Sequence, residues 1–322
     1  MNPSEEEEIS DFSLAESMDK AILMHRDAHF GGSFSIMIDY YEKGGKGVIP
    51  EFDLDRIQEL ASIEARTRQN LAATLLSGPE AEKVSRARDA YQKLKDLYEA
   101  KGKNKYPSLI ADLILSEEED PQETMATIVA EKGAIVPSLI LLLTSEELND
   151  PLFPGYGLAP ALAAKCLGMI GDKRAIISLY EAIGESDFFN EDYVLDALKN
   201  IGQPAKEFLL KVLHGRPLNF DNERAAIALV EFRHDPEVAK ACFDLLQDPE
   251  AQKDIPLCTY LTLACEGLKN KFTCRSNFFA SNFTGLKLSL SYSAKLYWLI
   301  SLLGDRCMAV TSVFSFAFCI SP

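Results

Sequence analysis

Two of the four histidines in the chain, His25 and His29, stand four residues apart. On a helix this spacing places both imidazoles on one face, as in the zinc peptidases, where a glutamate general base directly follows the first histidine. Arg26 occupies that position here, so the base is missing. The pattern supports two interpretations. One is a weak metal or active site at His25 and His29, and the other is a polar helix end before Gly31, with His29 near the negative end of the helix dipole.

The seven cysteines offer little metal chemistry. No two of them have the C-x-x-C spacing that many zinc sites use, so we expect neither a metal nor a cofactor. Four of them fall inside apolar helical patterns, which predicts buried, reduced thiols. These four are Cys166, Cys242, Cys258 and Cys265.

The chain is strongly acidic, because 49 Asp and Glu residues against 33 Lys and Arg residues give a formal charge of −16 over 322 residues. Such a surface repels phosphate backbones, which argues against nucleic acid and favours a neutral or basic protein partner. Residues 1–10 hold four consecutive glutamates and no basic or apolar leader, so we expect a cytoplasmic protein. The apolar stretches at 296–303 and 308–320 are too short for a transmembrane segment.

Helical periodicity dominates the first hundred residues, and strand-like alternation is nearly absent before residue 272. Pro79 lies in the first turn of a predicted helix that runs to about Gly102. Asp53 is the predicted N-cap of an earlier helix. The apolar stripe of the 79–102 helix follows 3-4-3-4 spacing at Val84, Ala87, Tyr91, Leu94 and Tyr98. We therefore expect residues 1–104 to form an N-terminal helical region of four or five helices.

An internal repeat of about 31 residues emerges after residue 105. Gly171 and Gly202 each end a helix, and Asp172 and Asp235 stand where the next helix needs an N-cap. Four small or apolar positions recur with this offset through three copies. They are Ala163, Val194 and Ala225; Cys166, Ala197 and Ala228; Leu167, Leu198 and Leu229; and Ile170, Ile201 and Phe232.

The repeating unit is thus a helix, a tight turn and a second helix. One such pair cannot bury its apolar face alone, so neighbouring pairs must stack. This predicts an all-α fold, an α-solenoid of helical hairpins. It also places Leu167, Leu198 and Leu229 in one continuous core.

The stretch from Cys166 to Ile183 resembles the bacterial HEAT repeat, especially its phycobilisome-lyase-like subgroup. The resemblance rests on the Leu-Gly-Met-Ile-Gly-Asp turn at 167–172 followed by Arg174 and Ala175 at a helix start. It covers residues 105–270 and implies HEAT-like hairpins there. Residues 144–160 depart from the pattern as an inserted loop.

Residues 271–322 form an atypical apolar and serine-rich tail. Residues 272–322 carry +3, which leaves −19 for the 271 residues before them, and the tail also holds the only tryptophan, Trp298. Repeat periodicity, acidity and turn chemistry all stop near residue 270. Two interpretations stay open: a distinct segment that caps the last repeat, or a sequence that is no part of the fold, as a shifted reading frame would produce. The second predicts poor packing, with some of Phe278, Phe279, Trp298 and Phe314 exposed.

An open solenoid presents a long surface without a closed pocket, which favours a scaffold that mediates protein–protein interaction over an enzyme. The stripe opposite the predicted core mixes aromatic, cationic and apolar side chains, as protein-binding surfaces do. Its members are Leu162, Lys165, Met169, Tyr193, Asp196, Asn200, Arg224, Ile227 and Glu231.

The resemblance implies two rival functions. The phycobilisome-lyase-like subgroup includes lyases and isomerases that attach bilin chromophores to a protein cysteine. Such an activity, or another enzymatic one, would use the region of His25 and His29. HEAT-like DNA glycosylases are the second rival, and the acidity of residues 1–271 disfavours them because their DNA-binding face is basic.

Overall fold

The computed structural model describes residues 17–45, 52–99, 105–116, 121–184 and 188–268. The chain divides into two compact units, residues 1–268 and residues 269–322, and all described residues belong to the first. The predictions for the tail therefore lie outside the described residues. The same holds for the predicted boundary at residue 104.

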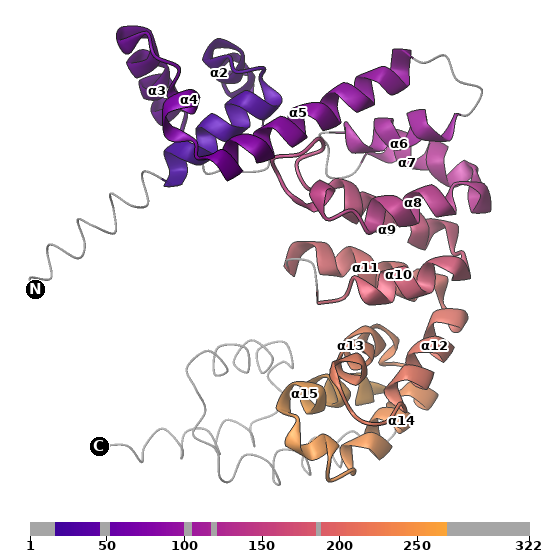
Figure 1. Ribbon diagram of the computed structural model, residues 1–322. Helices are drawn as coiled ribbons and strands as arrows, with labels where there is room; N and C mark the ends of the chain where they lie inside the picture. Colours follow the sequence, from indigo (N-terminus) through magenta and orange to yellow (C-terminus); the bar gives the residue numbers. More distant parts are fainter. Residues whose placement is uncertain (1–16, 46–51, 100–104, 117–120, 185–187, 269–322) are drawn as a thin grey trace, which may run out of the picture. The chain divides into compact units, whose positions relative to one another are not determined.

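The described part of the chain is all-α, with no strand among its residues (Figure 1). Its N-terminal part begins with a helix at residues 17–29. The next four helices are α2 (Phe34–Glu42), α3 (Leu54–Thr67), α4 (Leu71–Leu75) and α5 (Gly78–Glu99). Asp53 caps α3 as predicted, because its side chain accepts a hydrogen bond from the backbone N–H of Asp55.

Ten further α-helices follow in the described residues (Figure 1), and short 3-10 turns lie between some of them and after the last. They are α6 (Tyr106–Ile114), α7 (Gln122–Ala130), α8 (Val136–Leu143), α9 (Ala159–Ile170), α10 (Ile176–Glu181), α11 (Phe188–Ile201), α12 (Gln203–Leu213), α13 (Phe220–Leu229), α14 (Pro236–Leu246) and α15 (Ile255–Ala264). The turns are η1 (Lys132–Ala134), η2 (Glu147–Asn149), η3 (Lys173–Ala175), η4 (Val230–Phe232), η5 (Ala251–Lys253) and η6 (Cys265–Gly267).

Helices that are neighbours in sequence are also neighbours in space. α8 packs on α9, α10 on α11, α12 on α13 and α14 on α15. In addition, α9 contacts α11 and α13 contacts α15, so helices at equivalent places in successive hairpins touch. This packing is compatible with an α-solenoid.

The predicted core positions are confirmed at the centre of the repeat. Leu167, Leu198 and Leu229 are each 0 % exposed. Gly168 explains how closely α9 and α11 approach, because a Cβ there would lie 2.6 Å from the Cα of Ala197. The small residue thus permits backbone-to-backbone packing that a larger one would prevent.

Hydrogen bonds and ion pairs near the turns connect successive hairpins. Gly171 ends α9 in the left-handed conformation at φ +71°, and Asp172 then accepts a hydrogen bond from the backbone N–H of Arg174. The Arg174 guanidinium donates to the carbonyl oxygen of Gly133 in the preceding hairpin, 2.5 Å away. Lys206, only 6 % exposed, donates at 2.8 Å to both Asp235 and Glu237 in the following hairpin.

Candidate functional site

The predicted inserted loop is a packed segment rather than an exposed one. After η2, all residues from Leu152 to Gly157 are buried. Gly155, Tyr156 and Gly157 have φ values of +83°, +54° and +80°. A Cβ on Gly155 would lie 2.3 Å from the carbonyl oxygen of Ile114, so only glycine lets this segment approach α6. We call residues 150–157 the wedge segment.

His29, in the helix at residues 17–29, packs against the wedge segment. The Tyr91 hydroxyl lies 2.6 Å from Nδ1 of His29, and the carbonyl oxygen of Pro151 lies 3.1 Å from Nε2. Because a carbonyl only accepts, Nε2–H donates to Pro151 and Nδ1 accepts from Tyr91. The imidazole also stacks on Tyr156, with ring centroids 4.4 Å apart. One side chain therefore connects this helix, α5 and the wedge segment.

His25 lies directly against His29. The two imidazoles stack with centroids 5.1 Å apart and an interplanar angle of 29°, and Phe52 packs its edge against His25. Burial, together with the charge that His25 can carry, lowers the pKa of His29 to about 3. Burial likewise lowers the pKa of His25 to about 4, and Asp150 opposes this shift only in part. Both imidazoles are therefore neutral at pH 7.

Of the two interpretations, the polar helix end predicts a helix terminus at Gly31, and this is confirmed. His25 itself is buried, at only 7 % exposed. Gly31 and Gly32 both have positive φ, and the Gly32 N–H donates to the carbonyl oxygen of Arg26 at 3.1 Å.

A metal site does not fit this histidine pair. Both ring nitrogens of His29 are occupied by protein hydrogen bonds, so neither offers a lone pair to a metal ion. No group of three or more His, Cys, Asp or Glu residues within the described ranges is placed to hold one. The role of the histidine pair is structural: the stack of neutral imidazoles on Tyr156 joins the helix at residues 17–29 to the wedge segment.

Arg26, which stands where a zinc peptidase has its base, has a structural role. Its side chain is fully buried. The guanidinium donates to Asp27 at 2.6 Å and to Glu64 at 2.8 Å, and it lies 4.6 Å from the ring centroid of Phe34. The buried charge thus has two carboxylate partners and one aromatic face around it, as a buried cation requires. It binds the helix at residues 17–29 to α2 and α3.

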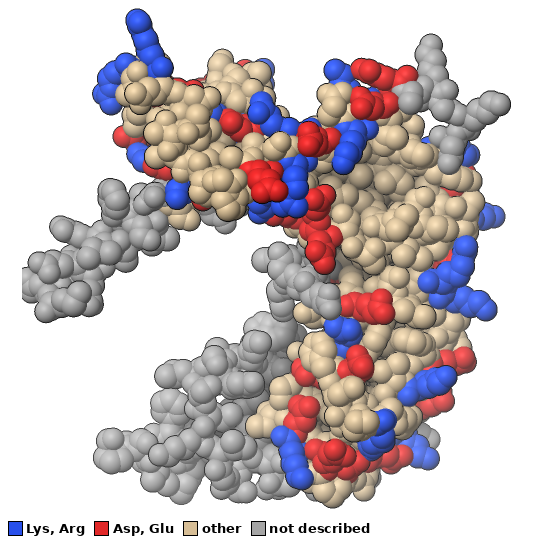
Figure 2. Space-filling model, viewed as in Figure 1, with Lys and Arg blue, Asp and Glu red and all other residues tan. Residues whose placement is uncertain are grey.

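Apolar and ionic contacts complete the junction between the N-terminal helices and the repeats. Leu152 and Phe153 of the wedge segment pack in one buried cluster with Ala28, Val84 and Ala87. Around it, Lys83 pairs with Asp150, and Arg86 pairs with Glu147 at 3.2 Å. Figure 2 shows acidic and basic side chains interspersed over the visible face rather than gathered in large patches of one sign.

The repeat stripe proposed from the sequence needs two corrections. Leu162 is 2 % exposed and Arg224 is 9 % exposed, so these two are not surface residues. Leu162 is buried because the first turns of α9 are covered on several sides rather than one. Arg224 is buried because its guanidinium packs over aromatic rings, with centroid distances of 5.6 Å to Tyr180 and 4.9 Å to Phe220.

The other members of the stripe reach the surface at least in part. Met169 is 49 % exposed, and Asp196 and Asn200 are exposed. Lys165, Tyr193, Ile227 and Glu231 are half-buried. The ammonium of Lys165 lies 5.7 Å from the ring centroid of Tyr193, and Lys199 pairs with Glu231 at 2.8 Å. These contacts link α9 to α11 and α11 to η4.

The predicted buried thiols are confirmed. Cys166, Cys242, Cys258 and Cys265 are buried, and none of these four described residues is in a disulfide. Burial raises the pKa of Cys166 to about 12 and that of Cys258 to about 11. Their thiolates are therefore strongly disfavoured at pH 7, which makes these two side chains packing elements rather than nucleophiles.

Sequence reasoning found His25 and His29 but missed their partners in the wedge segment, Pro151 and Tyr156. The signal available was the glycine pair around Tyr156, which marks a backbone that must pack closely. No protein-family model matches the chain, and no curated protein matches it either. None of the described helices is long and apolar enough to cross a membrane.

Proposed function

We propose that the chain is a HEAT-like repeat scaffold that binds a protein partner through the surface of helices α9 and α11. The partner we expect is a neutral or basic protein, because the chain carries a formal charge of −16. A cytoplasmic location agrees with the four buried thiols of the described residues, which are not in disulfides.

One observation carries this proposal. α9 packs on α11 and leaves Met169, Asp196 and Asn200 exposed next to the half-buried Lys165 and Tyr193. An apolar, an aromatic and several polar groups thus lie on two adjoining helices. This composition is typical of binding surfaces, where a few aromatic or cationic anchors supply most of the affinity.

The rival bilin-lyase-like activity at His25 and His29 has less support. Both imidazoles are neutral, His25 is buried and His29 is half-buried, and the hydrogen bonds of His29 are used within the protein. A general acid or base must reach the proton that it transfers, but His25 is buried and both ring nitrogens of His29 already have protein partners.

The proposal is tested with the tagged full chain, cross-linking and mass spectrometry. We expect a partner that the wild-type protein captures and that the double variant Met169→Glu with Tyr193→Ala loses. The matched control is Glu207→Ala with Lys211→Ala, two exposed positions on α12, which should retain it. A partner captured equally by all three proteins, each shown to be folded by circular dichroism, would remove α9 and α11 from consideration as the binding surface.

A further inference from the structure

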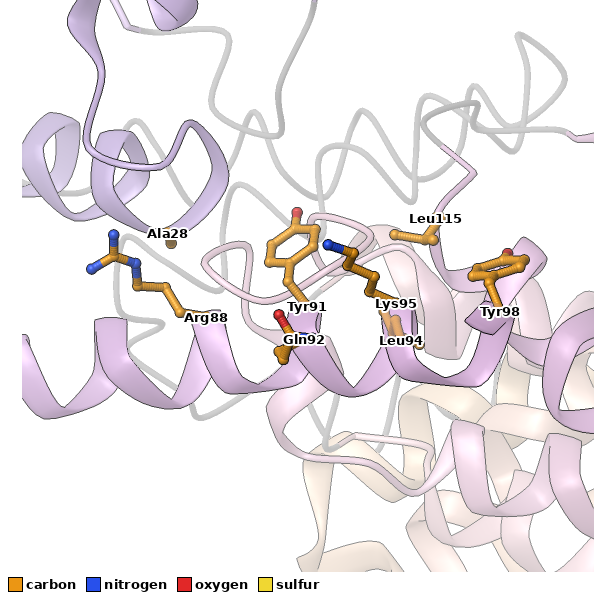
Figure 3. Close-up of a pocket in the computed structure, with 8 residues that line it drawn as sticks. All are labelled: Ala28, Arg88, Tyr91, Gln92, Leu94, Lys95, Tyr98 and Leu115. Carbon is orange, nitrogen blue, oxygen red and sulfur yellow. The ribbon is translucent and has the colours of Figure 1, made fainter. Parts of the chain in front are cut away.

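A groove with a volume of about 440 Å³ runs along α5 and carries charges of both signs. Figure 3 shows Arg88, Lys95 and Tyr98 extending from α5 toward this groove. Lys95 pairs with Glu99, and the Tyr98 hydroxyl donates a hydrogen bond to Asp112. Acidic groups therefore accompany the two cations, and the groove favours neither sign of partner.

The two most exposed large apolar side chains of the described repeats lie on α8 and α10. Leu141 of α8 is 74 % exposed and Ile177 of α10 is 57 % exposed. The two helices contact each other (Figure 1), and Pro137, one turn before Leu141, is exposed as well.

The burial patterns of α8 and α10 show that these side chains share one side of the helix pair. The two helices bury residues at the same spacing: Ile135, Val136, Leu139 and Leu143 at α8, and Ala175, Ile176, Leu179 and Ile183 at α10. Pro137 therefore corresponds to Ile177, and Leu141 corresponds to the exposed Glu181. We call the exposed side that holds these four residues and Lys173 the α8–α10 face.

Ile177 lies midway between opposite charges. Lys173 precedes it by four residues and Glu181 follows it by four, so the three side chains form one line along η3 and α10. All three are exposed, and neither charged group is in an ion pair with another described residue. The carboxylate beside Lys173, that of Asp172, is paired with Arg174 at 2.7 Å. The helix thus presents an apolar centre with a cation at one end and an anion at the other.

The charges of the flanking helices follow a compatible order. α8 itself has no charged residue, but the exposed Lys132 precedes it and the exposed Glu146 follows it. On α12, the exposed Glu207 and Lys211 stand one turn apart. The charged groups of α6 have partners within the chain: Lys105 pairs with Glu131, and Asp112 accepts from Tyr98. Reversing the direction of α8, α10 or α12 therefore sets each of their exposed charges opposite one of the other sign.

We propose that the α8–α10 face is the contact between two copies of this chain, related by a two-fold axis perpendicular to α10. A two-fold contact requires a surface that complements itself in reverse, and the line Lys173, Ile177 and Glu181 meets this requirement. The two α10 helices are antiparallel, and Ile177 of one copy meets Ile177 of the other. Lys173 of each copy then meets Glu181 of the other, and Leu141 packs on the methylene stem of that lysine.

The dimer goes beyond the partner binding proposed above, because it uses α8 and α10 rather than the surface of α9 and α11. α8 and α10 have only eight and six residues. Helices of this length offer less than the roughly 800 Å² per partner of a standard interface, so the dimer should be transient.

Sedimentation equilibrium of the purified full chain from about 5 to 500 µM measures the association. We expect a monomer–dimer equilibrium. The double variant Leu141→Glu with Ile177→Glu should raise the dimer Kd at least about 10-fold, because it buries like charges at the centre of the contact. A monomer at every concentration, or a dimer whose Kd this folded variant leaves unchanged, would overturn the proposal.

Charge reversal tests the antiparallel pairing. Lys173→Glu alone and Glu181→Lys alone should each raise the dimer Kd at least about 5-fold, because each brings like charges together. The double variant with both reversals, and an equimolar mixture of the two single variants, should return to within about 2-fold of wild type. Recovery of this kind cannot come from a loss of folding.

The matched control is a pair of single reversals on α14, Lys240→Glu and Asp244→Lys. These two residues are also exposed and four apart, and each reversal should change the dimer Kd less than about 2-fold. Single reversals at 173 and 181 that leave the Kd unchanged, or that the double variant does not rescue, would overturn the proposed pairing, as would an equal effect of the α14 controls.

Discussion

The repeats and the N-terminal junction bury their cores in different ways. In the repeats, the same leucine recurs at 167, 198 and 229, and each copy packs on its neighbours along the chain. At the junction, Phe153, His29 and Tyr156 each occur once and contact residues 60 to 130 positions away in sequence. A repeat core is therefore redundant and local, whereas the junction depends on single contacts that close long loops.

The first and largest effect should follow from Phe153→Ala at the junction. Phe153 is 2 % exposed in the cluster with Ala28 and Val84, so truncation should cost about 3–5 kcal/mol of the free energy of unfolding. Urea denaturation measures this loss. Hydrogen exchange should accelerate in α5 and the helix at residues 17–29 while α13 to α15 stay protected. Equal acceleration in all these helices would show that junction and repeats unfold as one unit.

Leu198→Ala makes the corresponding change in the repeats. The expected cost is about 2–5 kcal/mol, because the side chain is fully buried between α11 and its neighbours. Here hydrogen exchange should accelerate in α9, α11 and α12 and leave α3 unchanged. A loss under about 1 kcal/mol would contradict the assignment of this leucine to the core.

Acid should weaken the junction in particular. In the unfolded chain both histidines titrate near their ordinary pKa of 6.5, whereas in the folded protein His25 has a pKa of about 4 and His29 of about 3. Between these values the unfolded state binds more protons, so stability falls as pH drops through this window. From pH 7 to pH 5 the loss should be about 2 kcal/mol for each histidine.

The variant His29→Gln tests this origin of the acid sensitivity. It should be less stable at pH 7, since it removes the stack with Tyr156, but its stability should change less between pH 7 and pH 5. Denaturant titrations at both pH values supply the comparison. An unchanged slope in the variant would mean that His29 does not titrate with the folding reaction.

A smaller effect is expected from Gly155→Ala in the wedge segment. Alanine disfavours the φ of +83°, and its Cβ would approach the carbonyl oxygen of Ile114. The combined strain should cost about 1–3 kcal/mol. Gly171→Ala is the matched control in the repeats, because it has a positive φ of +71° but nothing within 4 Å of the added Cβ. If both variants lose the same stability, close packing against α6 adds nothing to the backbone strain.

The smallest effect should come from Lys199→Ala. Lys199 pairs with Glu231 on the surface between α11 and η4, with its side chain 49 % exposed. Exposed pairs of this kind contribute less than about 1 kcal/mol. Thermal unfolding at 50 mM and 500 mM NaCl should show the difference from wild type shrinking with salt. A larger loss would indicate that ion pairs, rather than the recurring leucines, hold successive hairpins together.

Patterns within a few turns of helix were predictable. The apolar stripe of α5 was correct at Val84, Ala87 and Leu94, which are buried, but Tyr98 at the end of the stripe is 46 % exposed. The turn residues Asp172 and Asp235 cap the elements that follow them, as expected. Such features follow from backbone geometry and hydrogen bonds among neighbouring residues. They can therefore be predicted from helical periodicity in a single sequence.

The candidate surface was predicted less well, because burial on the side opposite a helix core depends on what else packs there. Helix phase alone places Leu162 and Arg224 on the surface. The structure covers the start of α9, and it surrounds Arg224 with Tyr180 and Phe220. Helical periodicity in the sequence does not predict tertiary contacts of this kind.

The sequence by itself determined that the described chain is helical and where its recurring core leucines lie, since each is specified by neighbours at i+3, i+4 and i+7. Two other predicted core positions, Ile170 and Phe232, are only half-buried. Only the tertiary structure decided the role of His25, His29 and the wedge segment. Pro151 is 122 residues from His29. Whether an imidazole meets a metal, solvent or a carbonyl oxygen depends on which distant backbone packs against it. The environment of His29 is set by the burial of Leu152 and Phe153 against α5, which brings Pro151 to the imidazole. The spacing of the two histidines does not determine it.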